Sequence, residues 1–271
     1  SMCHGLARLL RNCALIPVLC VCNILYHICK AHYYWHAFHH IRWYSIEPHL
    51  LYPNISGLSV VIPSKYYYTI GLFSSAVLAL ATYWFWFLVR EDWASSYPHR
   101  VSSSYSIRQA TSRYLAFIGC IVLTVLASYP LDRGPIVHQT LKVLFTWLIL
   151  LHMVLNLYDR WMEIHYRKLI WTVEYFNTLV AILAATLGNI ILVTNPKNPL
   201  FMPNYSIATD DDIHFVERTL EYITFSAMLI HLILMTADMK NYEIVGYELL
   251  RKQRNQESGM CRNSSNTEKP V

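Results

Sequence analysis

Apolar residues are gathered along the chain into six blocks of about twenty residues, with polar segments between them. At 1.5 Å per residue, a helix made from each block is long enough to cross a hydrocarbon core of about 30 Å. A backbone in lipid must satisfy its own hydrogen bonds, and long apolar segments do so as helices. We therefore expect helices at about residues 12–29, 67–89, 114–129, 139–158, 169–194 and 215–236.

The composition is typical of a membrane protein and excludes an ordinary soluble domain. Hydrophobic residues make up 55% of the 271 residues and charged residues 14%, against about a quarter charged in soluble domains. The first block follows basic residues as a secretory signal does, but its apolar core is longer than that of most signals. The predicted fold is all-α, a polytopic membrane protein whose six-helix bundle forms one domain over residues 1–250. No nucleic-acid partner is expected.

Basic residues orient the bundle, because loops rich in Lys and Arg stay on the cytoplasmic side. With the N-terminus in the cytoplasm, fifteen of the 22 basic residues fall on that side. Both termini are then cytoplasmic. The loops at residues 30–66, 130–138 and 195–214 are lumenal, and residues 251–271 form a tail expected to be disordered because it has few large apolar side chains. The N-x-S sequons of Asn54 and Asn204 fall in lumenal loops, where N-glycosylation takes place.

Ionisable side chains inside the predicted spans form two layers at different depths, and such side chains are functional candidates. The lumenal layer holds Lys142, Glu217, Arg218 and Glu221, and the cytoplasmic layer holds His152, Glu174, His231 and Asp238. Glu217 and Glu221 are four residues apart and share a helix face, which a basic group of the fourth span could meet. Both layers are also typical of interhelical ion pairs and hydrogen bonds that position helices.

The segment HYYWHAFHH, at residues 32–40, has the histidine spacing of one box of membrane di-iron enzymes. Such enzymes need several boxes on the cytoplasmic side, whereas this box stands alone in a segment predicted to be lumenal. Two interpretations are left. His32, His36 and His40 could bind zinc from one helix face, or the histidines and aromatic rings could anchor the segment at the membrane interface. The second is favoured, so no metal is predicted.

Several segments resemble one family. LEYITFSAMLIHLILMTADMKNYEIVGYELL resembles the last span and tail of the family of post-GPI-attachment-to-proteins factor two, in the Frag/DRAM/Sfk superfamily, where GPI is glycosylphosphatidylinositol. YPNISGLSVVIPSKYYYTIGLF resembles that family's lumenal loop, and ILLHMVL and FNTLVAILAATLGNIILV resemble its fourth and fifth spans. The resemblance covers residues 52–250 and implies family-motif roles for Pro53, Ile55, Ser56, Pro63, His152, Glu221, Tyr222 and Asp238.

The resemblance implies lipid remodelling of GPI anchors in the Golgi membrane, with the endoplasmic reticulum as a second location. In this role the protein promotes reacylation of lyso-GPI-anchored proteins with a saturated acyl chain, and so their stable surface expression. Its partners would be membrane lipids and GPI-anchored proteins, and the acyl donor would be acyl-CoA or a phospholipid. The alternative is a non-catalytic scaffold or trafficking regulator, since other branches of the superfamily resemble regulators of autophagy or of phosphoinositide kinases. The oligomeric state is not predicted.

Acyl transfer needs a base for the acceptor hydroxyl and donors for the oxyanion. His152, Glu221 and Ser56 are the candidates for these roles. The topology separates His152 from Glu221 by roughly 10 Å along the membrane normal, which disfavours a single compact dyad. The sequence therefore assigns no catalytic residue, and leaves open whether the chain is an acyltransferase or the obligate helper of one.

Overall fold

The computed structural model describes most of the chain between Asn12 and Arg251. The described residues are 12–43, 55–59, 62–97, 103–129, 131, 134–161, 164–194, 211–240, 242–245 and 248–251. The side chains at 38–43, 162–168, 211–215 and 243–251 lie outside this description. Pro53, Asn54, Asn204 and the predicted tail beyond Arg251 also lie outside it.

Six long helices make up most of the described part of the chain, and each is long and apolar enough to cross a membrane. They are α2 (Leu15–Trp43), α3 (Ser64–Ser96), α4 (Tyr105–Ser128), α5 (Pro135–Trp161), α6 (Ile164–Thr194) and α7 (Asp211–Met239). This confirms the predicted all-α, six-helix membrane bundle. A short 3-10 helix, η1 (Ser56–Ser59), precedes α3, and an antiparallel pair of four-residue strands, β1 (Tyr242–Val245) and β2 (Glu248–Arg251), follows α7.

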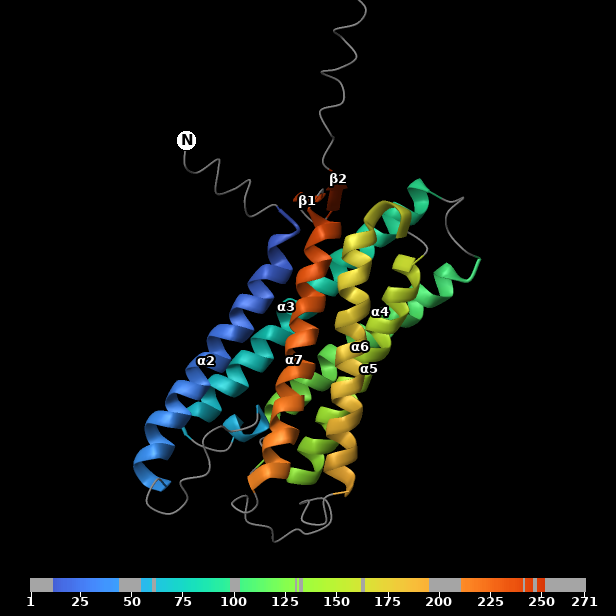
Figure 1. Cartoon of the computed structure of the whole chain (residues 1–271). Coiled ribbons are helices and arrows are strands. Elements are labelled where there is room, and N and C mark those ends of the chain that lie inside the picture. Colours follow the sequence, from blue (N-terminus) through green and yellow to red (C-terminus); the bar gives the residue numbers. More distant parts are fainter. Residues whose placement is uncertain are drawn as a thin grey trace, which may run out of the picture.

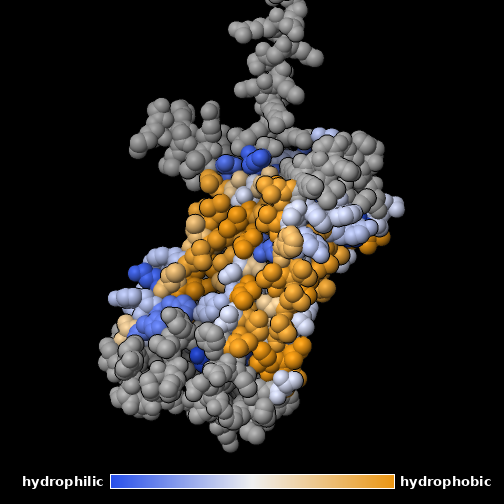
Figure 2. All heavy atoms as spheres, in the orientation of Figure 1, coloured by the Kyte–Doolittle hydropathy of each residue, from blue (hydrophilic) through white to orange (hydrophobic). Residues whose placement is uncertain are grey.

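Helices that follow one another in the chain pack side by side, and α7 also packs against α2 and α3 (Figure 1). The first and last described segments meet at one end of the bundle, where the Cys13 N–H donates to the Tyr242 carbonyl over 3.4 Å. We call this the terminal end, and the opposite end, where η1 lies, the loop end. On the face that Figure 2 shows, apolar residues make up most of the surface between the two ends, as expected of a surface that faces lipid.

The helices extend beyond the predicted spans, and the largest correction concerns the predicted loop 30–66. Its first part continues α2 to Trp43, and its last residues already belong to α3. Helix α4 begins at Tyr105 instead of residue 114, and α5 begins at Pro135, inside the predicted loop 130–138. The reason is physical: a helix satisfies its own backbone hydrogen bonds in water as well as in lipid, so it need not end where the apolar residues end.

The close contact between α2 and α3 depends on the small size of Gly71. A Cβ atom placed on Gly71 of α3 would overlap the Cβ of His27 on α2. Large buried side chains then fill the bundle toward the terminal end, among them Trp86, Phe87 and Met235. The glycine therefore lets the two helices approach closely, as small residues do at membrane helix contacts.

Candidate functional site

The 3-10 helix η1 is fixed at the loop end by hydrogen bonds of serine hydroxyls. Ser59 Oγ donates to the Ser56 carbonyl (2.7 Å) and accepts from the Leu131 N–H (3.0 Å). Ser64 Oγ, at the start of α3, donates to the Leu58 carbonyl (2.8 Å). These contacts tie the turn to α3 and to the segment between α4 and α5, so two separate parts of the chain help to fix the position of Ser56.

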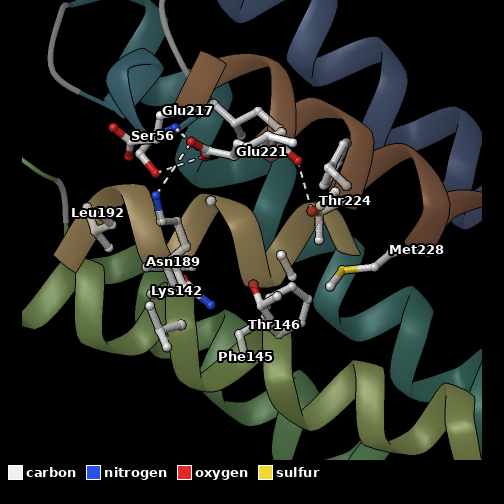
Figure 3. Close-up of a pocket in the computed structure, with 18 of the residues that line it drawn as sticks. Ser56, Lys142, Phe145, Thr146, Asn189, Leu192, Glu217, Glu221, Thr224 and Met228 are labelled. Carbon is white, nitrogen blue, oxygen red and sulfur yellow. Dashed lines mark hydrogen bonds and ion pairs between the residues drawn. The ribbon is translucent and has the colours of Figure 1, made fainter. Parts of the chain in front are cut away.

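Glu221 of α7 is the acceptor at the centre of the loop-end site (Figure 3). Its Oε1 accepts from the Ser56 N–H at 3.3 Å and from Ser56 Oγ at 3.2 Å. Its Oε2 lies 3.5 Å from Lys142 Nζ of α5. The Lys142 and Glu221 side chains are 18% and 14% exposed, so this ion pair is partly open to its surroundings. We refer to Ser56, Lys142 and Glu221 as the rim.

A cavity of about 100 Å³ opens beside the rim (Figure 3). It is lined by η1 and by all helices from α3 to α7. Polar lining residues besides the rim are Thr146, Asn189, Glu217 and Thr224. The apolar lining includes Leu72, Leu123, Phe145, Ala184, Ala185 and Met228. On α7, Met228 lies seven positions beyond Glu221, which is about 10 Å of helix. The cavity thus has charged and hydroxyl groups at the rim, and its lining beyond the rim is mostly apolar, with Thr146 and Thr224 as polar exceptions.

A second group of charged residues joins four helices toward the terminal end. Glu174 of α6 pairs with Arg160 Nε of α5 (2.5 Å) and with His231 Nδ1 of α7 (3.1 Å). Asp238 Oδ2 accepts from Arg160 Nη2 (2.7 Å) and from Trp86 Nε1 of α3 (2.9 Å). All five side chains are buried. We refer to these five residues as the terminal-end network.

His152 belongs to this sealed region and not to the cavity. Its Nδ1 lies 2.8 Å from Ser112 Oγ, and its Nε2 lies 2.9 Å from Asn156 Nδ2. Its ring centroid lies 5.3 Å from that of His231. His152 is ten positions from Lys142 along α5, or about 15 Å. Along α5, His152 therefore lies farther from the rim than the 10 Å expected between His152 and Glu221. His152 and Glu221 do not form a dyad.

The histidine-rich segment is helical, which corrects its prediction as a loop. His32 Nε2 lies 2.6 Å from the Tyr222 hydroxyl, and the His32 and His36 rings stack with centroids 6.3 Å apart. The His40 side chain lies outside the described part. Among the side chains that are described, no group of three or more His, Cys, Asp or Glu is arranged to hold a metal. His32 therefore connects α2 to α7, beside Glu221.

The remaining sequence candidates are distributed around the two sites. Ile55 is buried and lines the cavity, and Pro63 directly precedes α3. Glu217 lines the cavity one turn before Glu221, and Arg218 follows it on α7. The predicted pairing of span four with span six is thus present between Lys142 and Glu221.

The sequence does not single out Asn189 or Arg160 as site residues. Asn189 is an uncharged polar residue in an apolar run, LGNIILV, and this interruption is the available signal. Arg160 lies just beyond the predicted span 139–158, but it is 4% exposed and pairs with two carboxylates. No sequence signal distinguishes it from a loop arginine, because it lies at the end of an apolar block.

No protein-family model, curated protein or solved structure matches this chain. The resemblance to the GPI-anchor remodelling family stays a prediction, and the geometry of the two sites carries the functional interpretation.

Proposed function

We propose that the protein binds the lipid of GPI anchors and promotes reacylation of lyso-GPI-anchored proteins with a saturated chain in the Golgi membrane. The observation that carries this proposal is the cavity, with Ser56, Lys142 and Glu221 at its mouth and an apolar interior. A lysolipid has the matching form, because a phosphate-bearing head is joined to one apolar chain. Lys142 supplies a positive charge for such a head, and burial of the chain against apolar side chains favours binding.

The family-motif residues support the same proposal. Ser56 and Glu221 are 165 positions apart in sequence, yet they are hydrogen-bonded at the cavity mouth. Tyr222, next to Glu221 in sequence, pairs with His32. Ile55, next to Ser56 in sequence, lines the cavity. Four of the residues singled out by the resemblance, Ile55, Ser56, Glu221 and Tyr222, therefore lie together at the loop end, as a functional site there would require. Two others, His152 and Asp238, lie toward the terminal end. Basic-residue orientation puts this end in the lumen, where GPI anchors lie.

Reacylation requires a hydroxyl of the lyso-lipid to attack the acyl carbonyl carbon of acyl-CoA or a phospholipid. A new ester C–O bond forms, the donor's C–S or C–O bond breaks, and the hydroxyl proton passes to the leaving group. Glu221 is placed to accept and return that proton, and Lys142 and the Ser56 N–H lie beside it. The protein acts either as the acyltransferase itself or as the helper that presents the lyso-lipid to one.

A second candidate function is a non-catalytic membrane scaffold or trafficking factor. The terminal-end network favours it, because Arg160, Glu174 and Asp238 are buried and the arginine pairs with both carboxylates. Such a network holds helices in one arrangement without contacting a substrate. In this case the loop-end cavity would bind lipid without turning it over.

Rescue of knockout cells tests the primary proposal. Wild-type protein should restore saturated chains to GPI anchors, read by mass spectrometry, and surface levels of a GPI-anchored reporter. Glu221→Gln, at equal protein level, should lower restoration at least tenfold, because it removes the carboxylate that contacts Ser56 and Lys142. The matched control is Glu91→Gln, which makes the same change at a 55% exposed carboxylate near the C-terminal end of α3, away from the cavity. Full restoration by Glu221→Gln would overturn the proposal, whereas normal anchors in the knockout itself would favour the scaffold.

A further inference from the structure

The side chain of Asn189 on α6 carries a hydrogen-bond donor at the loop-end cavity. Its side chain lines the loop-end cavity, and its Nδ2 is buried without a hydrogen-bond partner among the described residues. A buried donor without an acceptor is costly, so such groups in folded proteins are seldom left unpaired. An acceptor supplied by a bound molecule would remove this cost.

The other asparagines of the described helices do not share this feature, although the Oε1 atoms of Gln109 and Gln139 are also buried without a partner among the described residues. Asn177, on the same helix, donates from Nδ2 to the Ala227 carbonyl of α7 at 2.8 Å. Asn23 Nδ2 lies 2.8 Å from Ser74 Oγ, and Asn156 Nδ2 lies 2.9 Å from His152 Nε2. These three amides join neighbouring helices or turns of one helix, which accounts for them structurally. Asn189 faces a cavity instead, which a purely structural role does not explain.

The level of Asn189 in the bundle matches the cavity mouth. Gly188, its neighbour, packs against α7 beside Leu220: a Cβ on Gly188 would lie 3.6 Å from the Leu220 Cβ. Leu220 directly precedes Glu221, so Asn189 lies near the depth of the rim. About one turn before Asn189 on α6, and farther from the rim, Ala184 and Ala185 line the cavity with methyl groups alone. Deeper in the cavity lies Met228, which belongs to the buried cluster that also contains Ile149 and Met153.

This order of groups corresponds to the order of groups in an acyl lipid. A polar head precedes an ester carbonyl, and the carbonyl precedes the alkyl chain. We infer that Asn189 Nδ2 donates a hydrogen bond to the ester carbonyl oxygen of the bound lipid, while the first carbons of the chain run past Ala184 and Ala185 toward Met228. Asn189 is then the residue that distinguishes an acyl lipid from its ether analogue. The inference rests on the proposed function, because it takes the molecule bound in the cavity to be a lipid.

Two lysolipids that differ in one carbonyl group test it. The purified full chain in lipid nanodiscs is titrated with 1-palmitoyl-lysophosphatidylinositol and with its 1-O-hexadecyl ether, which lacks the carbonyl. Wild-type protein should bind the ester about fivefold more tightly, the ratio expected for one neutral hydrogen bond. Asn189→Leu should bring the ratio to about one while keeping affinity for the ether. Binding of the ether also shows that the variant is folded, and Asn189→Ala serves if the leucine variant does not fold.

Asn177→Leu is the matched control, because it makes the same substitution on the same helix at an amide that is already bonded. It should keep the fivefold ratio even if the protein becomes less stable. Equal binding of both lipids by wild-type protein would overturn the role of Asn189 and leave the proposed function standing. Persistence of the ratio in Asn189→Leu would also overturn it. Binding of neither lipid would overturn both the inference and the lipid-binding cavity on which the proposed function rests.

Discussion

The two charged sites of the bundle differ in access. At the loop end, Glu221 and Lys142 are partly exposed, their contact is long at 3.5 Å, and a cavity adjoins them. Toward the terminal end, Arg160 lies 2.5 Å from Glu174 and 2.7 Å from Asp238, and all three are buried. The same residue types therefore serve two purposes. Buried charges that pair with one another hold helices together, whereas accessible charges beside a cavity are available to a ligand.

The largest effect is expected from removal of the shared cation of the terminal-end network. Arg160→Met keeps most of the side-chain volume but leaves the Glu174 and Asp238 carboxylates buried without their main partner. We expect a loss of about 3–5 kcal/mol in the free energy of unfolding, measured by thermal unfolding in detergent and seen in cells as low protein levels. The control is Arg113→Met, whose partner Glu91 is 55% exposed; it should cost about 1 kcal/mol or less. Equal losses for the two variants would contradict the distinction between sealed and open charges.

The difference between the sites was only partly accessible to sequence reasoning. The six spans follow directly from the apolar blocks, and the depth layers of Lys142 with Glu221 and of His231 with Glu174 follow from counting residues along those spans. Access does not follow, because burial of Arg160 depends on how α5, α6 and α7 pack. The contact of Ser56 with Glu221 joins positions far apart in the chain, so local pattern could not predict it, although the family resemblance had named both residues.

Filling the cavity should abolish lipid binding with a smaller effect on stability. Ala184→Phe places a ring where the cavity is lined by a methyl group. We expect at least a tenfold loss of lysophosphatidylinositol affinity, and a stability loss of about 1–3 kcal/mol from overpacking. Leu183→Phe places the same aromatic ring at the neighbouring position, which is 53% exposed on the outer surface. It should leave affinity unchanged, so weakened binding in both variants would place the lipid somewhere other than the cavity.

The smallest effect is expected at the contact between α2 and the rim. Tyr222→Phe removes the hydroxyl that lies 2.6 Å from His32 Nε2. Interhelical hydrogen bonds of this kind contribute about 0.6 kcal/mol, so the unfolding temperature should fall by a few degrees or less. The double variant Tyr222→Phe with His32→Phe should be hardly less stable than His32→Phe alone, because the first substitution already removes the interaction. Fully additive losses would show that the two side chains do not interact.

The most direct test of the account is the position of a bound lipid chain. Lysophosphatidylinositol with a small photoreactive diazirine near the middle of its acyl chain can be cross-linked to the purified protein and mapped by peptide mass spectrometry. Adducts are predicted on cavity residues such as Thr146, Ala185 and Thr224, and they should disappear in Ala184→Phe and with excess unlabelled lipid. Adducts confined to outward-facing residues of α6, such as Leu183, Leu187 and Ile190, would contradict a lipid-binding cavity at the loop end.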